Sequence, residues 1–327
     1  MKTIGIRVST SENYGKGHIE RCLTIRKYIA FKVIWFIDYF NSSIEKKIPK
    51  EDKIYYEDGI DKVDNLKKNI IHKQLDLIFI DSYNIKTKEL YDYRENIPIA
   101  VIIDSNINVY ANMIICPQPI NLKLNKSIKY LTGPNYAPVA EDFYLNYKKK
   151  ITTKNILISF GAYDSKGITL KVIKAVKNIF KANNYKYNMY VMLGAKSPIL
   201  DKVKVAIKDF SYFKLLVDEK NIASIYKNCY FAIGAPGLSH MERLSSGLPS
   251  LLIAQNIKHE VLIEKWASIS CGIQSKNTIS SIENNVRYML KNEKILNKIK
   301  YNGRLLIDGK GAMRISKELH KLGNLND

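Results

Sequence analysis

The sequence predicts an α/β protein built from two doubly wound, Rossmann-like domains that face a cleft. Three observations carry this prediction: strand-like runs that are apolar nearly throughout, helical stretches between them, and a second round of this alternation after a polar interruption. Strands of this kind are typical of a parallel sheet covered on both faces. The length of 327 residues also suits two domains better than one.

The first domain is expected over residues 1–146. Helices are predicted between several of its strands, notably at residues 59–73 and 86–95. The predicted strands cover residues 3–8, 32–38, 53–57, 76–81, 99–104 and 113–116.

Polar residues stand at the ends of two of these strands. Ligands of parallel sheets bind at the carboxyl ends of the strands, which is where Asp81, Tyr83 and Asp104 fall. Each of the three could equally be a helix cap or a turn residue.

A polar, basic stretch without periodicity, residues 147–153, is interpreted as the linker. Beyond it the alternation restarts, and the second domain is expected over residues 154–327. Its predicted strands cover residues 155–161, 187–193, 212–217, 230–234 and 247–254, and helices from about residue 259 to residue 325 finish the chain.

The net charge of +21 raises the question of a nucleic-acid or anionic membrane partner. The lysines, however, are spread along the chain among Ile, Asn and Tyr, and only Lys148, Lys149 and Lys150 form a cluster. Such a composition also arises when the coding sequence is AT-rich, so specific nucleic-acid binding is not expected. A positive field would still attract a phosphorylated small molecule.

Cysteine usage and hydropathy indicate the class of protein. The four cysteines are far apart and form no Cys-x-x-Cys pair, so neither a zinc site nor a disulfide framework is implied. No run reaches the roughly 18 apolar residues of a membrane span, and the N-terminus shows no signal-peptide pattern. We expect a soluble, cytoplasmic protein without a metal or cofactor; the oligomeric state is left open.

The loop after the first predicted strand is the strongest candidate site. Gly15 and Gly17 allow a tight turn and close approach to a ligand, and the helix that follows offers free N–H groups to an anion. His18 stands at the helix start, where the positive end of the helix dipole favours the neutral ring that a general base needs. The alternative is that His18 is only a cap or a packed ring.

A second phosphate-binding candidate is the loop at residues 234–239. A strand, two glycines and a helix opening with Ser239 supply backbone N–H groups and a dipole end for a diphosphate. Neither loop is a Walker loop or a dinucleotide fingerprint. Glu242 could accept hydrogen bonds from ribose hydroxyls, or it could form a surface charge pair with Arg243. His240 and His259 are interpreted as surface or packing residues.

Five motifs stand in order along the chain: GKGHIER (15–21), IDSY (80–83), GPNYAPVAEDF (133–143), ISFGAYD (158–164) and AIGAPGLSHMERLSSGLPS (232–250). Together they resemble the family of UDP-2,4-diacetamido-2,4,6-trideoxy-β-L-altropyranose hydrolases, which act in pseudaminic acid biosynthesis. The match runs from residue 3 to about residue 273.

The resemblance implies a GT-B fold whose first domain holds the sugar, whose second holds UDP and whose last helix crosses back to the first. His18 would activate water for inverting attack at the anomeric carbon, without a metal. Gly17 and Arg21 would lie near the diphosphate and sugar, and Asp81 and Tyr83 would face the sugar. The substrate-binding positions it implies are Gly15, Gly17, Arg21, Asp81, Tyr83, Gly161, Ala235, Gly237, Ser239 and Glu242.

Several positions depart from the family pattern. An aspartate expected after the first strand is Ser9, and the second of two paired aspartates after the fifth strand is Ser105. Ala162 replaces a glycine, Pro236 stands in a glycine-rich loop, and His259 falls where an Asn-Gln pair is expected. These departures gather around ligand positions and bear on the identity of the sugar.

Three functional hypotheses follow. The first is a UDP-sugar hydrolase that makes a 2,4-diacetamido-trideoxy hexose for a nonulosonic acid on flagella or surface polysaccharide. The second is a glycosyltransferase or hydrolysing UDP-sugar 2-epimerase of the same fold. The third is a non-catalytic binding protein whose charge recruits an acidic partner.

Overall fold

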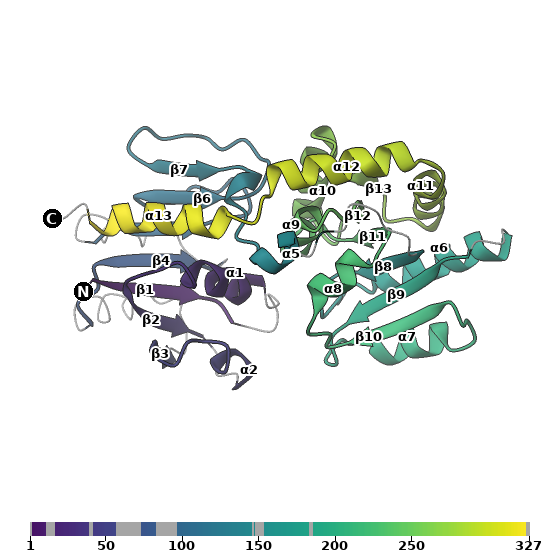
Figure 1. Cartoon of the computed structure of the whole chain (residues 1–327), viewed down its shortest axis with the longest axis horizontal. Helices are drawn as coiled ribbons and strands as arrows, with labels where there is room; N and C mark the ends of the chain where they lie inside the picture. The colour runs from purple at the N-terminus through teal and green to yellow at the C-terminus, as the bar shows by residue number, and fades with distance from the viewer. Residues whose placement is uncertain are drawn as a thin grey trace. The chain divides into compact units, whose positions relative to one another are not determined.

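The structure is a computed structural model of the whole chain and divides into two compact units (Figure 1). Unit 1 comprises Met1–Pro138 and Lys310–Asp327, and unit 2 comprises Val139–Gly309. The residues that the structure describes are 2–10, 17–38, 42–56, 73–82, 97–145, 147, 154–182 and 186–324.

Unit 1 is organised around a seven-stranded parallel sheet with the order β3-β2-β1-β4-β5-β6-β7. The chain runs outward from β1 to β3, then returns to the other side of β1 and continues from β4. The space beside the carboxyl ends of β1 and β4 is therefore a topological switch point. The strands are β1 (Thr3–Val8), β2 (Lys32–Ile37), β3 (Lys53–Tyr56), β4 (Leu77–Asp81), β5 (Ile99–Ile102), β6 (Met113–Cys116) and β7 (Lys129–Thr132).

Two helices from opposite ends of the chain cover one face of this sheet. They are α1 (Gly17–Arg26) and α13 (Gly311–Gly323), which pack against each other (Figure 1). Ile4 on β1 shares one buried apolar cluster with Ile25 of α1 and Ile315 of α13. The expected range 154–327 thus includes a helix that lies in unit 1.

The unit boundary lies earlier than the expected residue 146. Helix α5 (Glu141–Leu145) packs against α8 (Ile222–Lys227) and α9 (Leu238–Ser245), so it belongs to unit 2. The guanidinium of Arg304 also lies 3.9 Å from the ring centroids of both Tyr144 and Tyr147 and donates to the Tyr144 carbonyl at 3.1 Å. These contacts attach α5 and Tyr147, the first residue of the expected linker, to unit 2.

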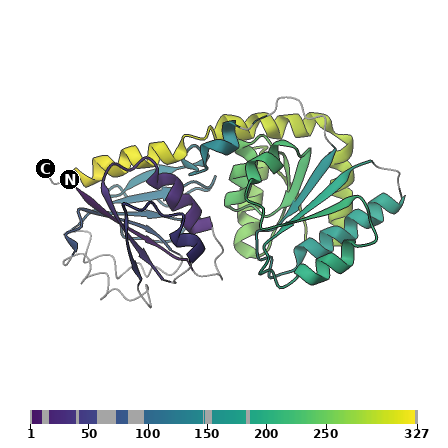
Figure 2. The ribbon, with the colours of Figure 1, turned by 60° about the horizontal axis from the view of Figure 1, so that its bottom comes forward.

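Unit 2 repeats the architecture with a six-stranded parallel sheet of order β10-β9-β8-β11-β12-β13. Figure 2 shows helices on both faces of this sheet. Its strands are β8 (Asn155–Ser159), β9 (Asn188–Leu193), β10 (Phe213–Val217), β11 (Phe231–Gly234), β12 (Ser250–Ile253) and β13 (Ile273–Ser275). Its remaining helices are α6 (Ile168–Ala182), α7 (Leu200–Ile207), α10 (Ile257–Ser268), α11 (Ile279–Lys291) and α12 (Glu293–Leu306). None of the described helices of the chain is long and apolar enough to cross a membrane.

The predicted fold class, two doubly wound α/β domains, is confirmed in the architecture of each unit. Two edge strands were not predicted, β7 and β13. Both are short, and in each only one residue, Leu131 and Ser275 respectively, is buried, so the apolar signal is weak.

The packing of α13 gives the first testable prediction. Ile315 is fully buried, so Ile315→Ala should lower the free energy of unfolding of unit 1 by about 2–4 kcal/mol. Met313, on the same helix and 46% exposed, is the matched control, and Met313→Ala should change it by less than about 0.5 kcal/mol.

The measurement is urea unfolding followed by tryptophan fluorescence. The chain has two tryptophans, Trp35 in unit 1 and Trp266 in unit 2, so a Trp266→Phe background isolates the signal of unit 1. Equal effects of the two alanine variants would contradict the packing described for α13.

Candidate active site

A histidine and an aspartate meet at the switch point of unit 1. His18 is the second residue of α1 and only 4% exposed, and Asp81 is the fully buried last residue of β4. The Nδ1 atom of His18 lies 2.5 Å from Oδ1 of Asp81. Asp81 is the last residue of β4, so its carboxylate stands at the carboxyl edge of the sheet, beside the start of α1.

Arg21, one turn further along α1, connects this pair to the next strands. Its Nε donates to Asp81 Oδ2 at 2.5 Å and its Nη2 to Asp81 Oδ1 at 2.6 Å, a bidentate pair. Its Nη1 reaches both oxygens of Asp104, after β5, at 3.0 and 2.9 Å. Gln118, two residues beyond β6, donates from Nε2 to Asp104 Oδ1 at 3.1 Å. We call these five residues the His18 cluster.

The electrostatics fix the protonation of Asp81. Burial alone raises the pKa of Asp81, but the charges of Arg21 and His18 and their hydrogen bonds outweigh it and lower the pKa to about 2. Asp81 is therefore ionised near neutral pH and can only accept hydrogen bonds. The neutral His18 ring must then carry its proton on Nδ1, which leaves the lone pair on Nε2.

An imidazole oriented by a carboxylate in this way can act as a general base. The carboxylate stabilises the imidazolium that forms when Nε2 accepts a proton, as a positioned acid–base residue requires. Among the described residues, no group of three or more His, Cys, Asp or Glu side chains could hold a metal ion.

The loop that leaves β1 is held by a residue that sequence reasoning missed. Asp38 follows β2 and accepts hydrogen bonds from Ser9 Oγ at 2.7 Å and from the backbone N–H of Thr10 at 2.6 Å. Asp38 and Gln118 both stand just after a predicted strand, the signal that singled out Asp81. Applying that signal to every strand would have found them.

In unit 2, the predicted substrate-binding residues lie at the carboxyl ends of the neighbouring strands β8 and β11. They stand on the loops that follow these strands and on the first turns of α9. Gly161 is exposed with φ of 89°, and Asp164 accepts hydrogen bonds from the first N–H groups of α6, at Ile168 and Thr169, at 3.2 and 2.8 Å. Burial raises the pKa of Asp164. This carboxylate occupies the start of α6 and leaves α9 as the candidate anion site of unit 2.

The loop after β11 is built against a buried arginine. A Cβ on Gly234 would lie 2.4 Å from the Ser159 carbonyl oxygen and 3.0 Å from Arg243 Nη1, so only glycine fits there. Arg243 is fully buried and donates to the Ala235 carbonyl at 2.7 Å and to Ser250 Oγ at 2.8 Å. The alternative of a surface charge pair is therefore wrong for Arg243, which supports the loop from inside.

Beyond Arg243, the start of α9 is open. Gly237 precedes the helix without a side-chain cap, and an added Cβ there would have no neighbour within 4 Å. Ala235, Ser239 and Glu242 are partly exposed on this loop and the first turns of α9. Pro236 has no N–H, so the donors for an anion come from Gly237 onward.

The structure brings His18, Arg21 and Asp81 together as one cluster, and Gly17 begins the helix that carries it. Gly15 and Tyr83 lie outside the described residues. The roles of the positions in both units remain predictions.

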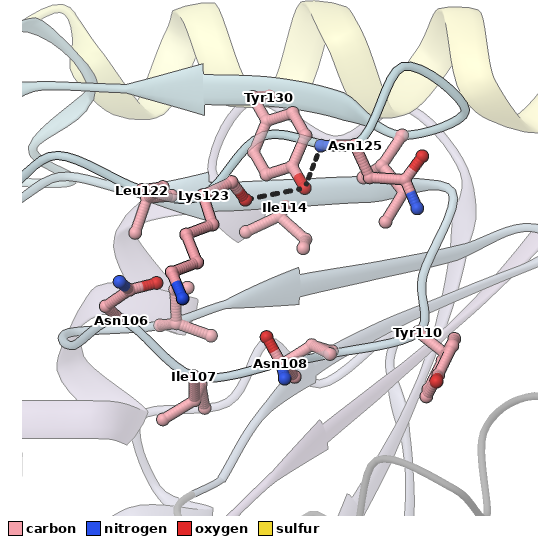
Figure 3. A pocket seen from close by; sticks show the side chains of 12 residues that line it. Asn106, Ile107, Asn108, Tyr110, Ile114, Leu122, Lys123, Asn125 and Tyr130 are labelled. Atoms are coloured by element: carbon pink, nitrogen blue, oxygen red, sulfur yellow. Dashed lines mark hydrogen bonds between the residues drawn. The ribbon is translucent and has the colours of Figure 1, made fainter.

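Unit 1 also has a hollow of about 210 Å³ that shares no residue with the His18 cluster (Figure 3). It lies between the β5–β6 and β6–β7 connections, over Ile114. In Figure 3, Tyr130 closes one wall by accepting a hydrogen bond from the backbone N–H of Asn125 at 3.1 Å. The hollow contains no histidine or carboxylate, so it offers no acid–base chemistry.

No family model matches the sequence. The chain is 27% identical over 278 residues to an uncharacterized protein of Methanocaldococcus jannaschii, a match that covers 77% of this chain and 56% of that protein. It is 25% identical over 198 residues to the spore coat polysaccharide biosynthesis protein SpsG of Bacillus subtilis, covering 58% of each. The matches thus span a little over half the length of these curated relatives.

Solved structures match along nearly the whole chain. MurG of Acinetobacter baumannii has a TM-score of 0.73 at 13% identity, covering 98% of this chain and 100% of that one. The UDP-GlcNAc 2-epimerase of Neisseria meningitidis, bound to UDP-GlcNAc, has a TM-score of 0.70 at 12% identity, covering 98% and 100%. MnaA of S. aureus, solved with UDP, has a TM-score of 0.72 at 13% identity, covering 100% and 98%. At these identities the likeness shows the fold, which is GT-B.

His240, in unit 2, gives a prediction about pH. Its ring is fully buried, edge-on to Trp266 with centroids 5.1 Å apart. Burial and the nearby charge of Arg243 hold its pKa well below the ordinary value. As pH falls through about 6.5, the unfolded chain takes up a proton that the folded chain does not, so stability should fall by about 1.4 kcal/mol per pH unit.

Urea unfolding between about pH 6.5 and 5.5, read from Trp266 in a Trp35→Phe background, measures this loss. His240→Phe should remove it, whereas His259→Gln, at a partly exposed histidine of the same unit, should leave it in place. An undiminished loss in His240→Phe would show that another group is responsible.

Proposed function

We propose that the chain is a nucleotide-sugar hydrolase that cleaves a UDP-linked 2,4-diacetamido-2,4,6-trideoxy hexose and releases UDP and the free sugar. The observation that carries this proposal is the 2.5 Å contact between His18 and Asp81 at the switch point of unit 1. It supports a neutral base whose free nitrogen faces away from its carboxylate partner. The family resemblance supplies the identity of the sugar.

In the proposed reaction, His18 Nε2 takes a proton from water as the water oxygen attacks the anomeric carbon. The bond from that carbon to the diphosphate oxygen breaks, and its electron pair leaves with UDP. Attack opposite the leaving group inverts the anomeric configuration. Asp81 stays ionised throughout and balances the imidazolium.

The leaving diphosphate needs stabilisation of its negative charge. The uncapped start of α9, after Gly237, presents backbone N–H groups that suit this role, and Glu242 one turn later would bind the ribose. The names of solved structures with the same fold support a uridine nucleotide, since MnaA was solved with UDP and the epimerase with UDP-GlcNAc.

The relative named as a spore coat polysaccharide biosynthesis protein supports a place in surface polysaccharide synthesis. In the proposed role, the free sugar enters a nonulosonic acid of the pseudaminic type, used on flagella or surface polysaccharide, and the enzyme works in the cytoplasm without a metal or cofactor.

A second candidate is a glycosyltransferase or hydrolysing UDP-sugar 2-epimerase. It is favoured by solved structures of the same fold that carry these names, among them the epimerase of N. meningitidis and CalG4, the calicheamicin glycosyltransferase. In that reaction His18 would serve a sugar hydroxyl or a ring proton instead of water.

UDP release from the diacetamido-trideoxy UDP-sugar, without an acceptor, tests the proposal. His18→Ala should lower the rate by about 10²–10⁴-fold, because it removes the base and leaves substrate binding in place. His320→Gln, at a histidine of α13 in the same unit, should stay close to the unsubstituted protein. NMR of the released sugar should show inversion at the anomeric carbon.

Other outcomes would replace the proposal. UDP release only in the presence of an acceptor would indicate a transferase. Exchange of the proton at C2 of UDP-GlcNAc would indicate an epimerase. Binding without turnover, detected as a UDP-dependent rise in melting temperature, would indicate a binding protein.

A further inference from the structure

We propose that Asp104 and Gln118 are positioning residues for the base, acting through Arg21. This inference rests on the proposed function and extends it by two residues that are joined to each other and, through Asp104, to Arg21. In this role, Asp104 and Gln118 orient the Arg21 guanidinium and offset its charge. They thereby influence whether His18 is protonated and which ring nitrogen carries the proton.

The geometry forms a chain along the carboxyl edge of three neighbouring strands. The Arg21 guanidinium is held on one side by Asp81 of β4 and on the other by Asp104 after β5. Gln118, 2% exposed, fixes one oxygen of Asp104 from the end of β6. A guanidinium anchored at both ends has one orientation, and that orientation aims Nε and Nη2 at Asp81.

The charges give Asp104 a second effect. Arg21 Nη2 lies 3.3 Å from His18 Nδ1, so its positive charge opposes the imidazolium that forms when the base accepts a proton. Asp104 offsets that charge. With two carboxylates and one guanidinium, a protonated His18 makes the cluster neutral; without the Asp104 charge, the cluster would be positive.

The charged and titratable groups in contact with the His18–Asp81 pair include Arg21 and Cys22 of α1. Arg21 lies against both members of the pair, and the Cys22 thiol lies 3.5 Å from Asp81 Oδ2. Burial and the charge of Asp81 raise the pKa of the Cys22 thiol, which stays neutral and does not contribute charge. Asp104 therefore adjusts the charge balance at the base through Arg21.

The same helix provides a matched control. Arg26 of α1 donates to Asp52 from Nε at 2.7 Å and from Nη2 at 2.6 Å, and the Asp52 side chain is 1% exposed. This is also an arginine–carboxylate pair on α1, with a buried carboxylate and a partly buried arginine, but it contacts no member of the His18 cluster through the hydrogen bonds described. Asp52→Asn therefore reproduces the structural damage of Asp104→Asn without its electrostatic effect.

The first measurement is the pH dependence of UDP release. Asp104→Asn should lower kcat about tenfold with KM changed less than about threefold, and should move the acid limb of the profile to lower pH by about half to one unit. Gln118→Leu should shift the profile in the same direction by a smaller amount. Asp104→Glu should retain a larger part of kcat than Asp104→Asn does. Asp52→Asn should leave the acid limb in place.

The second measurement does not depend on turnover. Two-bond ¹H–¹⁵N spectra of histidine-labelled protein, assigned with His18→Ala, report which ring nitrogen carries the proton. The unsubstituted protein should show the Nδ1–H tautomer, and Asp104→Asn should show a mixture with Nε2–H, whereas Asp52→Asn should match the unsubstituted protein.

The two measurements separate the two proposals. If the unsubstituted protein does not hydrolyse the UDP-sugar but shows the Nδ1–H signal, and Asp104→Asn disturbs that signal, the proposed function is wrong and the positioning role stands. An acid limb and a tautomer signal that are the same in Asp104→Asn and Asp52→Asn would overturn the positioning role, even if both variants lose activity.

Discussion

The buried guanidinium of Arg21, shared by Asp81 and Asp104, is the interaction on which the first unit and its site both depend. A buried charge must be paired, and removing one partner of such a pair typically costs about 3–5 kcal/mol. Arg21 lies on α1, and its two carboxylate partners stand at the end of β4 and just after β5. The need to pair this charge therefore helps to set where α1 begins over the sheet, and thereby where His18 lies. Arg21, which lies against both Asp81 and His18, is thus also part of what holds α1 in place.

The two units use the same strand order with different chemistry at the carboxyl edge. In unit 1 that edge carries His18, Arg21 and two carboxylates in direct contact. In unit 2 the loops after β8 and β11 present glycine and backbone, and the arginine there, Arg243, is turned inward to hold a carbonyl. Charged side chains at the sheet edge of unit 1 suit proton transfer, and backbone N–H groups at the sheet edge of unit 2 suit a diphosphate. The proposed hydrolase needs both of these functions.

Much of the fold could be predicted from the sequence because strands such as IAVI of β5 are buried on both faces and therefore apolar at every position. The edge strands β7 and β13 were missed because burial acts on only one of their residues. For the site, the rule that ligands lie after strand ends found Asp81 and Asp104. It could not show that Arg21 joins them, because the two aspartates lie 60 and 83 residues further along the chain. It also could not show that Arg243 is buried, because a helix start next to a glycine loop gives no signal for burial of a charged side chain.

The departures from the family pattern have local physical explanations. Ser9 donates to Asp38, so an aspartate at position 9 would bring two carboxylates together at a half-buried site. Ala162 accepts a hydrogen bond from the Gly194 N–H at 2.8 Å and lies so close that a side chain at Gly194 would clash with it. In both cases the changed residue is matched by a partner in its own unit. Ser9 also donates its backbone N–H to the Asp81 carbonyl at 3.2 Å, a bond that does not depend on the side chain at position 9. The serine therefore leaves the Asp81 carboxylate in place for its contact with His18.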